Sequence, residues 1–205
     1  MPLVYQQNIN AVTKIGVWHI TEAEGFFMGQ VPLQREITHW HKRLQHLAGR
    51  LLLKELYPDF PVELIRIAGT KKPFLQDEPF HFSIAHSGDY AAVMVSKACR
   101  VGVDVELNGK KIENIIPKFL TTEERFLLPG NAIAAMATLF WSVKETIFKW
   151  NSSAGVDFKK HIAILSITGD HVEGIVHCMF NGVRSLDVHF LHFNNNYLTW
   201  LFTTN

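Results

Sequence analysis

Cysteine is scarce in this sequence. The 205 residues include only Cys99 and Cys178, too few for a disulfide scaffold in a chain of this length. Two cysteines cannot build a zinc site alone, and the eleven histidines are scattered, with His39 and His41 as the closest pair. Residues two apart on a helix point to different faces, so this pair does not indicate a metal site.

Long apolar runs are also missing. The apolar run Leu47–Leu53 is interrupted by Gly49 and Arg50, and no stretch approaches the length that spans a bilayer. Residues 1–10 lack the basic region and apolar run of a signal peptide. We therefore expect a soluble, cytoplasmic protein with no membrane partner.

Neither sign of charge dominates. Lysine and arginine number 20, aspartate and glutamate 19, and the formal net charge is +1. General nucleic-acid binding needs a strong positive field to displace counterions from phosphates, so nucleic acid is not an expected partner. A local basic pocket for one small phosphate-rich ligand remains compatible with this balance.

Hydrophobic periodicity predicts a mixture of helices and strands. Long helices are expected over residues 34–56 and 132–150, with a mixed helical region over 113–128. Strands are expected over 15–20, 62–67, 80–84, 90–96 and 101–107, and an antiparallel sheet over 162–167, 172–179, 185–192 and 198–202. The short connection at 97–100 predicts a hairpin between its two flanking strands. Each half thus has a long helix and several strands, which suits an α+β fold of two similar lobes, residues 1–100 and 101–205.

An acidic strand is the first candidate site. Residues two apart on a strand share a face, so Asp104 and Glu106 point the same way while Val101, Val103 and Val105 point into the core. Two adjacent carboxylates repel each other, and a hard divalent cation such as Mg²⁺ relieves that repulsion. A surface strand with acidic residues facing water is the alternative.

The second candidate lies on the helix over 132–150. Phe140, Val143 and Ile147 belong to one apolar stripe, and Glu145 and Lys149 lie one turn apart on the opposite side. A solvent-facing ion pair would explain these two charges. Trp141 shares the Glu145 side, however, and a large aromatic there indicates that this face is also covered.

A third segment combines Lys71 and Lys72 on a proline-restricted loop with His86 at the junction of a strand and a turn. Such groups could hold a phosphate. A solvated loop and a structural histidine are equally compatible with the pattern.

In this order, these segments resemble the surfactin-synthetase-activating type of 4′-phosphopantetheinyl transferase. The matching motifs are Lys72-Pro73, Phe82–Gly88, Gly102–Glu106 and Trp141–Lys149, together with Leu47–Arg50 and Phe119–Glu124. The resemblance implies two similar α/β lobes in a pseudo-twofold arrangement, each with a long helix packed on an antiparallel sheet. It also implies a monomer that holds coenzyme A where the lobes meet.

By this resemblance, the chain transfers the 4′-phosphopantetheine moiety of coenzyme A to a serine of an apo acyl or peptidyl carrier protein and releases 3′,5′-ADP. Asp104, Glu106 and Glu145 are the implied Mg²⁺ ligands in the C-terminal lobe. Glu145 is also the candidate base for the serine hydroxyl. Lys149 would stabilise the leaving group, and Lys144 is a second candidate for the pyrophosphate.

The resemblance assigns the nucleotide of coenzyme A to the N-terminal lobe. Lys72 and His86 would bind the 3′-phosphate. Arg43, Arg50 and Lys71 would complete a basic wall around it.

The carrier protein is expected to dock on apolar residues between the two acidic motifs. The candidates are Ile115, Ile116, Phe119, Leu120, Phe126 and Leu127, of which half or more should be buried in the core. Two other functions stay open: a different magnesium-dependent phosphoryl-transfer enzyme, such as a nuclease, and a non-catalytic coenzyme A-binding protein.

Overall fold

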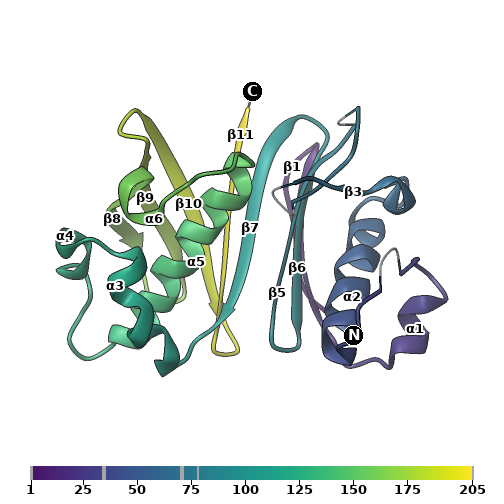
Figure 1. The fold of residues 1–205 in the computed structure, drawn as a ribbon, viewed down its shortest axis with the longest axis horizontal. Helices are drawn as coiled ribbons and strands as arrows, with labels where there is room; N and C mark the ends of the chain where they lie inside the picture. The colour runs from purple at the N-terminus through teal and green to yellow at the C-terminus, as the bar shows by residue number, and fades with distance from the viewer. Residues whose placement is uncertain (1, 34–35, 70–71, 78, 205) are drawn as a thin grey trace. The chain divides into compact units, whose positions relative to one another are not determined.

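The computed structural model describes residues 2–33, 36–69, 72–77 and 79–204, and the chain divides into two compact units (Figure 1). The first unit consists of Met1–Val103 with Phe202–Asn205, and the second of Asp104–Leu201. In the described part of the chain, no helix has the length and apolar character needed to cross a membrane.

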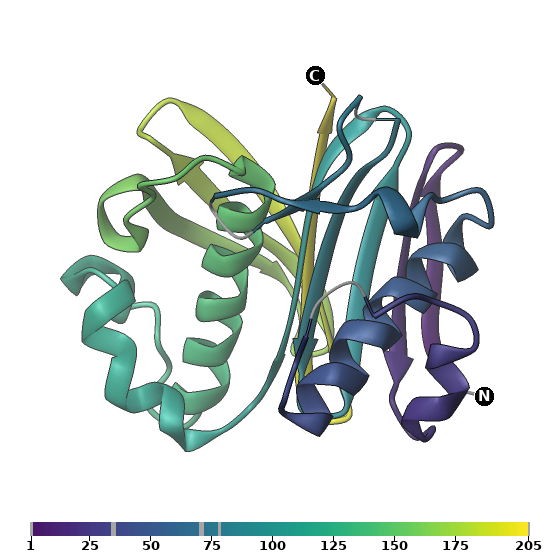
Figure 2. The same ribbon diagram turned by 45° about the vertical axis from the view of Figure 1, so that its right-hand side comes forward.

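A four-stranded antiparallel sheet in the order β1-β2-β6-β5 forms the first unit. Its strands are β1 (Leu3–Asn10), β2 (Thr13–His19), β5 (His81–Ser87) and β6 (Tyr90–Ser96). Helix α2 (Trp40–Leu56) lies against this sheet (Figure 2), and its leucines belong to the core of the unit. Smaller elements complete the unit: α1 (Glu24–Met28), η1 (Val62–Leu64), β3 (Arg66–Ile67) and β4 (Pro73–Phe74). The sequence analysis did not predict β1 or α1.

The first long helix begins later than predicted. Helix α2 starts at Trp40 with His39 as its N-cap, whereas the prediction began at Gln34, which lies outside the described residues. Arg43 explains part of the difference, because its guanidinium donates to the carbonyls of Ile37 and Thr38. These carbonyls therefore have partners without a preceding helical turn.

The predicted strand over 62–67 is wrong in its first half. Residues Val62–Leu64 form a 3₁₀ turn after Pro61, and only Arg66–Ile67 are extended. Val62 and Ile65 are both buried, and Leu64 between them is exposed. A spacing of three matches a 3₁₀ turn rather than a strand, in which alternate residues share a face.

The predicted hairpin between 90–96 and 101–107 is also wrong. Strand β6 pairs with β2 on one side and with β5 on the other, so neither edge is left for β7 (Cys99–Leu107), which joins the second sheet. The Ser96 hydroxyl accepts the backbone N–H groups of Ala98 and Cys99 where the chain leaves β6. The hairpin partner of β6 is β5, joined through Gly88 with a positive φ of 52°.

A five-stranded sheet and one long helix make up the second unit. The sheet order is β7-β11-β10-β9-β8, with β8 (Ile162–Gly169), β9 (Glu173–Phe180), β10 (Arg184–Phe193) and β11 (Asn196–Thr204). Helix α5 (Ile133–Asn151) packs on this sheet and shares its core (Figures 1 and 2). Short helices fill the connections: η2 (Lys110–Ile115), α3 (Ile116–Phe119), α4 (Thr122–Arg125) and α6 (Phe158–His161).

The α+β fold class is confirmed. Each unit has one long helix packed on an antiparallel sheet, and the four strands predicted between residues 162 and 202 are all present. The pseudo-twofold arrangement of the lobes stays a prediction.

A close approach between α2 and β5 gives a test of packing in the first unit. A Cβ added at Gly49 would lie 2.8 Å from Cγ2 of Ile84. We predict that Gly49→Ala lowers the free energy of unfolding by roughly 1–2 kcal/mol, because overpacking outweighs the gain in helix propensity. Urea denaturation measures the change.

The control uses the same substitution in an Ile84→Ala background, where the space is open. There, Gly49→Ala should stabilise the protein, as it does in an ordinary helix. A stabilising effect in the presence of Ile84 would contradict the packing argument.

Candidate active site

Strand β7 brings two carboxylates to the second unit. Asp104 is only 3% exposed and Glu106 is partly exposed, while Val103 and Val105 are fully buried. The alternative of an acidic strand facing water is therefore wrong for Asp104. A carboxylate this deeply buried needs partners that offset its lost hydration.

Helix α5 supplies the principal partner of Asp104. The Lys149 ammonium lies 2.5 Å from Oδ1 of Asp104, so this lysine is not part of a solvent-facing pair on the helix surface. Burial opposes the charge on Lys149, but the carboxylates of Asp104, Glu145 and Glu106 outweigh it and raise the pKa of this lysine. All three predicted metal-binding carboxylates thus act on one ammonium group.

Glu145 lies one turn before Lys149 and is partly buried. Burial raises the pKa of its carboxyl group; the Lys149 ammonium lowers it, and the negative charge of Asp104 raises it further. Glu145 therefore shares an electrostatic environment with Asp104, although the two residues come from different elements.

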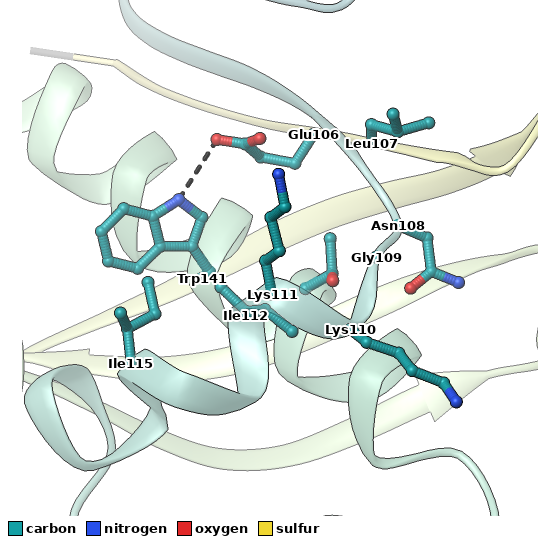
Figure 3. A pocket seen from close by; sticks show the side chains of 10 residues that line it. Glu106, Leu107, Asn108, Gly109, Lys110, Lys111, Ile112, Ile115 and Trp141 are labelled. Atoms are coloured by element: carbon teal, nitrogen blue, oxygen red, sulfur yellow. Dashed lines mark hydrogen bonds between the residues drawn. The ribbon is translucent and has the colours of Figure 1, made fainter.

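Trp141 holds the third carboxylate. Its indole Nε1 donates to Oε1 of Glu106 at 3.2 Å, which explains the aromatic on the Glu145 side of α5. Both residues line a cavity of about 580 Å³ between the end of β7, η2 and α5. Figure 3 shows Lys111 extending along the indole toward Glu106, with the apolar side chains of Ile112 and Ile115 beside them.

The donor chemistry of this site fits a divalent cation. Three carboxylates against one ammonium leave an excess of negative charge, and carboxylate oxygens are the ligands that Mg²⁺ prefers. Across the described ranges, no three His, Cys, Asp or Glu side chains are already gathered as metal ligands. In this arrangement, Lys149 contacts Asp104 and Trp141 donates to Glu106.

The structure contradicts the prediction that Lys144 contacts the pyrophosphate. Its ammonium is fully buried, 2.7 Å from Oε1 of Glu124, and donates to the carbonyls of Phe119, Phe158 and Ile162. It lies on a different side of α5 from the carboxylate cluster and joins α3, α4, α6 and β8. Lys144 is therefore a structural lysine and not a pyrophosphate ligand.

A polar cavity of about 200 Å³ brings together several predicted nucleotide-binding residues of the first unit. Arg50 and His86 line it, as does Pro73, which follows Lys72 in the sequence. His46, which the sequence analysis missed, also lines it, and its Nδ1 lies 3.1 Å from Nη1 of Arg50. The spacing of four residues between His46 and Arg50 on the predicted helix could have identified this pair.

Arg43, another predicted basic residue, does not line the cavity. Arg43 pairs through Nε and Nη2 with both carboxylate oxygens of Glu24, at 2.9 Å each. Hydrogen bonding to Arg43 lowers the pKa of that glutamate, and the pair fixes α1 against α2. Arg43 is therefore a structural residue here, while Lys71 lies outside the described residues.

The buried pair of Lys144 and Glu124 predicts a large effect on stability. Lys144→Met should lower the free energy of unfolding by about 3–5 kcal/mol, because it leaves the Glu124 carboxylate buried without its cation. Urea denaturation checks this. Lys160→Met is the matched control, since Lys160 is exposed and its change should stay within about 0.5 kcal/mol. Equal midpoints for the two variants would contradict the structural assignment of Lys144.

Comparison with known proteins bears on the same region. Residues 100–201, about half of the chain, match the family model described as the 4'-phosphopantetheinyl transferase superfamily. This segment contains all of β7 but its first residue, the whole of α5, and the three carboxylates with Lys149.

Several curated relatives are similar to the chain. The 4'-phosphopantetheinyl transferase AcpT of Escherichia coli K12 is 28% identical over 122 residues, 57% of this chain and 62% of the relative. AcpT of Salmonella typhi is 30% identical over 131 residues, 59% of this chain and 66% of the relative. A phosphopantetheinyl transferase of Thraustochytrium is 26% identical over 166 residues, 69% of this chain and 57% of the relative.

The matched region thus spans less than two thirds of the length of these relatives. The family match includes the whole of the carboxylate cluster. In the segment that carries its candidate active site, the chain is similar to 4'-phosphopantetheinyl transferases.

Proposed function

We propose that this chain is a 4′-phosphopantetheinyl transferase. It transfers the 4′-phosphopantetheine arm of coenzyme A to a serine hydroxyl of an apo carrier protein and releases 3′,5′-ADP. The observation that supports this most strongly is the contact of the Lys149 ammonium with the buried Asp104 carboxylate, with Glu145 and Glu106 adding to the same electrostatic environment, within the segment that is similar to the transferase family.

Asp104, Glu106 and Glu145 would hold Mg²⁺, which when bound supplies positive charge to the pyrophosphate of coenzyme A. Lys149 comes from the same cluster and carries a charge that its neighbours stabilise. We assign to it the contact with a phosphate oxygen, where it offsets the negative charge that the departing 3′,5′-ADP takes with the electron pair of the broken P–O bond.

Glu145 is the proposed base. The serine oxygen forms a bond to the phosphorus that bears the pantetheine arm, and its proton passes to the Glu145 carboxylate, directly or through a water. Because burial raises the pKa of Glu145, this carboxylate holds a proton more firmly than an exposed glutamate would.

The cavity beside Glu106 suits the pantetheine arm, which alternates amides with short alkyl segments. Ile112, Ile115 and Trp141 offer apolar surface. Within the described residues, the buried Oδ1 of Asn108 has no hydrogen-bond donor, so it can accept an amide N–H. The lining thus combines the two kinds of contact that the arm requires.

The N-terminal unit is proposed to bind the nucleotide. Arg50, His46 and His86 line one polar cavity, and we assign Lys72, which precedes the lining residue Pro73, to the same phosphate. Arg50 is almost fully buried, so its charge acts in a region of low dielectric. These groups suit the 3′-phosphate, the feature that separates coenzyme A from its dephospho form.

The carrier-protein surface is smaller than the predicted set. Ile116, Phe119 and Leu120 are buried in the core, which confirms the expectation that half or more would be. Phe126 is 85% exposed and Leu127 38% exposed, so we assign the docking contact to these two.

Asp104→Asn tests the metal assignment with little change in shape. We expect transfer to fall at least about a hundredfold, since the neutral amide removes a charge that holds the cation. Mass spectrometry of an apo carrier protein after incubation with Mg²⁺, coenzyme A and the variant measures the gain of the arm. Asp187→Asn is the control, because Asp187 is an exposed aspartate of β10 paired with His177. Normal turnover in Asp104→Asn would refute the assignment.

The same assay separates the remaining alternatives. A nuclease or another phosphoryl-transfer enzyme adds no mass to the carrier. A non-catalytic coenzyme A-binding protein binds coenzyme A but also transfers nothing, and its Glu145→Ala variant has no transfer to lose.

His86→Ala tests the nucleotide cavity. Its kcat/KM for coenzyme A should fall about tenfold, while kcat/KM for 3′-dephospho-coenzyme A should stay unchanged, because only the former carries the contacted phosphate. His81→Ala, on the same strand β5 but outside the lining of the cavity, is the matched control. An equal loss with both substrates would argue against a 3′-phosphate contact.

A further inference from the structure

A line of buried hydroxyl groups ends at the carboxylate of Asp104. Ser142 and Thr146 come from α5 and Thr199 from β11, and all three are completely buried. Hydroxyls in an otherwise apolar interior cost free energy unless they are hydrogen-bonded, so their presence between helix and sheet needs an explanation.

The distances make these groups one continuous chain. Ser142 Oγ lies 2.9 Å from Oδ2 of Asp104 and 2.8 Å from Oγ1 of Thr199. Thr199 Oγ1 in turn lies 2.6 Å from Oγ1 of Thr146, which also contacts the Thr199 carbonyl at 3.2 Å.

Counting protons gives this chain a direction. The Asp104 carboxylate is the partner of the Lys149 ammonium and acts as an acceptor, so Ser142 donates its single proton to Oδ2. Thr199 must then donate its single proton to Ser142. The Thr146 hydroxyl donates to Thr199, where its one proton faces both Oγ1 and the backbone carbonyl. The O–H dipoles of Ser142 and Thr199 therefore point toward Asp104, and hydrogen bonds aligned in this way strengthen one another.

The two oxygens of Asp104 consequently have different neighbours. Oδ2 is held by the hydroxyl chain, and Oδ1 by Lys149, whose side chain is partly exposed. We propose that Ser142, supported by Thr199 and Thr146, is a positioning residue that fixes the orientation of the Asp104 carboxylate for the cation. This inference rests on the proposed function, in which Asp104 is a metal ligand.

Metal binding gives a readout independent of turnover. The experiment measures the affinity of the protein for Mn²⁺ in the presence of coenzyme A, from the electron paramagnetic resonance signal of free Mn²⁺. Ser142→Ala should raise the Kd about tenfold, the effect of one hydrogen bond to a charged group. Thr199→Val should raise it about threefold, because Ser142 can still donate to Asp104 but loses the aligned dipole behind it. Thr199→Ser, which keeps the hydroxyl, should have the wild-type affinity for Mn²⁺.

The matched control is Thr13→Val in the N-terminal unit. Thr13 is also completely buried and pairs its hydroxyl with Ser96 at 2.8 Å, without any contact to Asp104. Thr13→Val should lose about as much thermal stability as the Thr199→Val variant and keep the wild-type Kd for Mn²⁺. A change in Kd that is confined to the Ser142 and Thr199 variants therefore supports the positioning role.

Asp104→Asn separates the positioning role of Ser142 from the metal-binding role of Asp104. Wild-type Mn²⁺ affinity in Ser142→Ala, with weakened binding in Asp104→Asn, would overturn the positioning role alone. Wild-type affinity in both would overturn the metal assignment of the proposed function. If Ser142→Ala does not fold, the Mn²⁺ affinities of Thr199→Val and Thr199→Ser test the proposal instead. Equal affinity in those two variants would overturn the positioning role of the hydroxyl groups.

Discussion

The ion pair between Lys149 and Asp104 is the interaction on which the candidate site depends. Three carboxylates from β7 and α5 act on one ammonium group, in a region where Asp104 has almost no contact with water. Without a cation, this arrangement would be electrostatically unfavourable. The lysine thus allows a negatively charged cluster to exist in the folded protein, and the same cluster has the composition of a binding site for a divalent metal.

Two lysines on α5 illustrate how position on a helix determines role. Lys144 and Lys149 face different sides of the helix, and each pairs with a buried carboxylate. Lys144 is enclosed by Glu124 and three backbone carbonyls, so its charge is committed to holding α3, α4, α6 and β8 together. Lys149 keeps a partly exposed side chain, as its proposed contact with a substrate phosphate requires.

A similar distinction separates the arginines of α2. Arg43 forms a two-point pair with Glu24, a geometry that fixes α1 and leaves its guanidinium committed. Arg50 instead lines a polar cavity with His46 and His86. On both long helices, the basic residues that we assign to phosphate contacts, Arg50 and Lys149, adjoin a cavity or the carboxylate cluster.

The sequence by itself determined the α+β class, the long helix α5, the last four strands and the residue types of the candidate site. These features depend on local periodicity and on short motifs, which are written in neighbouring residues. Only the tertiary structure decided the partner of β6, the burial of Lys144, the pairing of Arg43 and the hydroxyl chain behind Asp104. Each of these depends on contacts between residues far apart in the chain: β6 lost its predicted partner because β2 and β5 occupy both of its edges, and Ser142 meets Thr199 because α5 packs on β11.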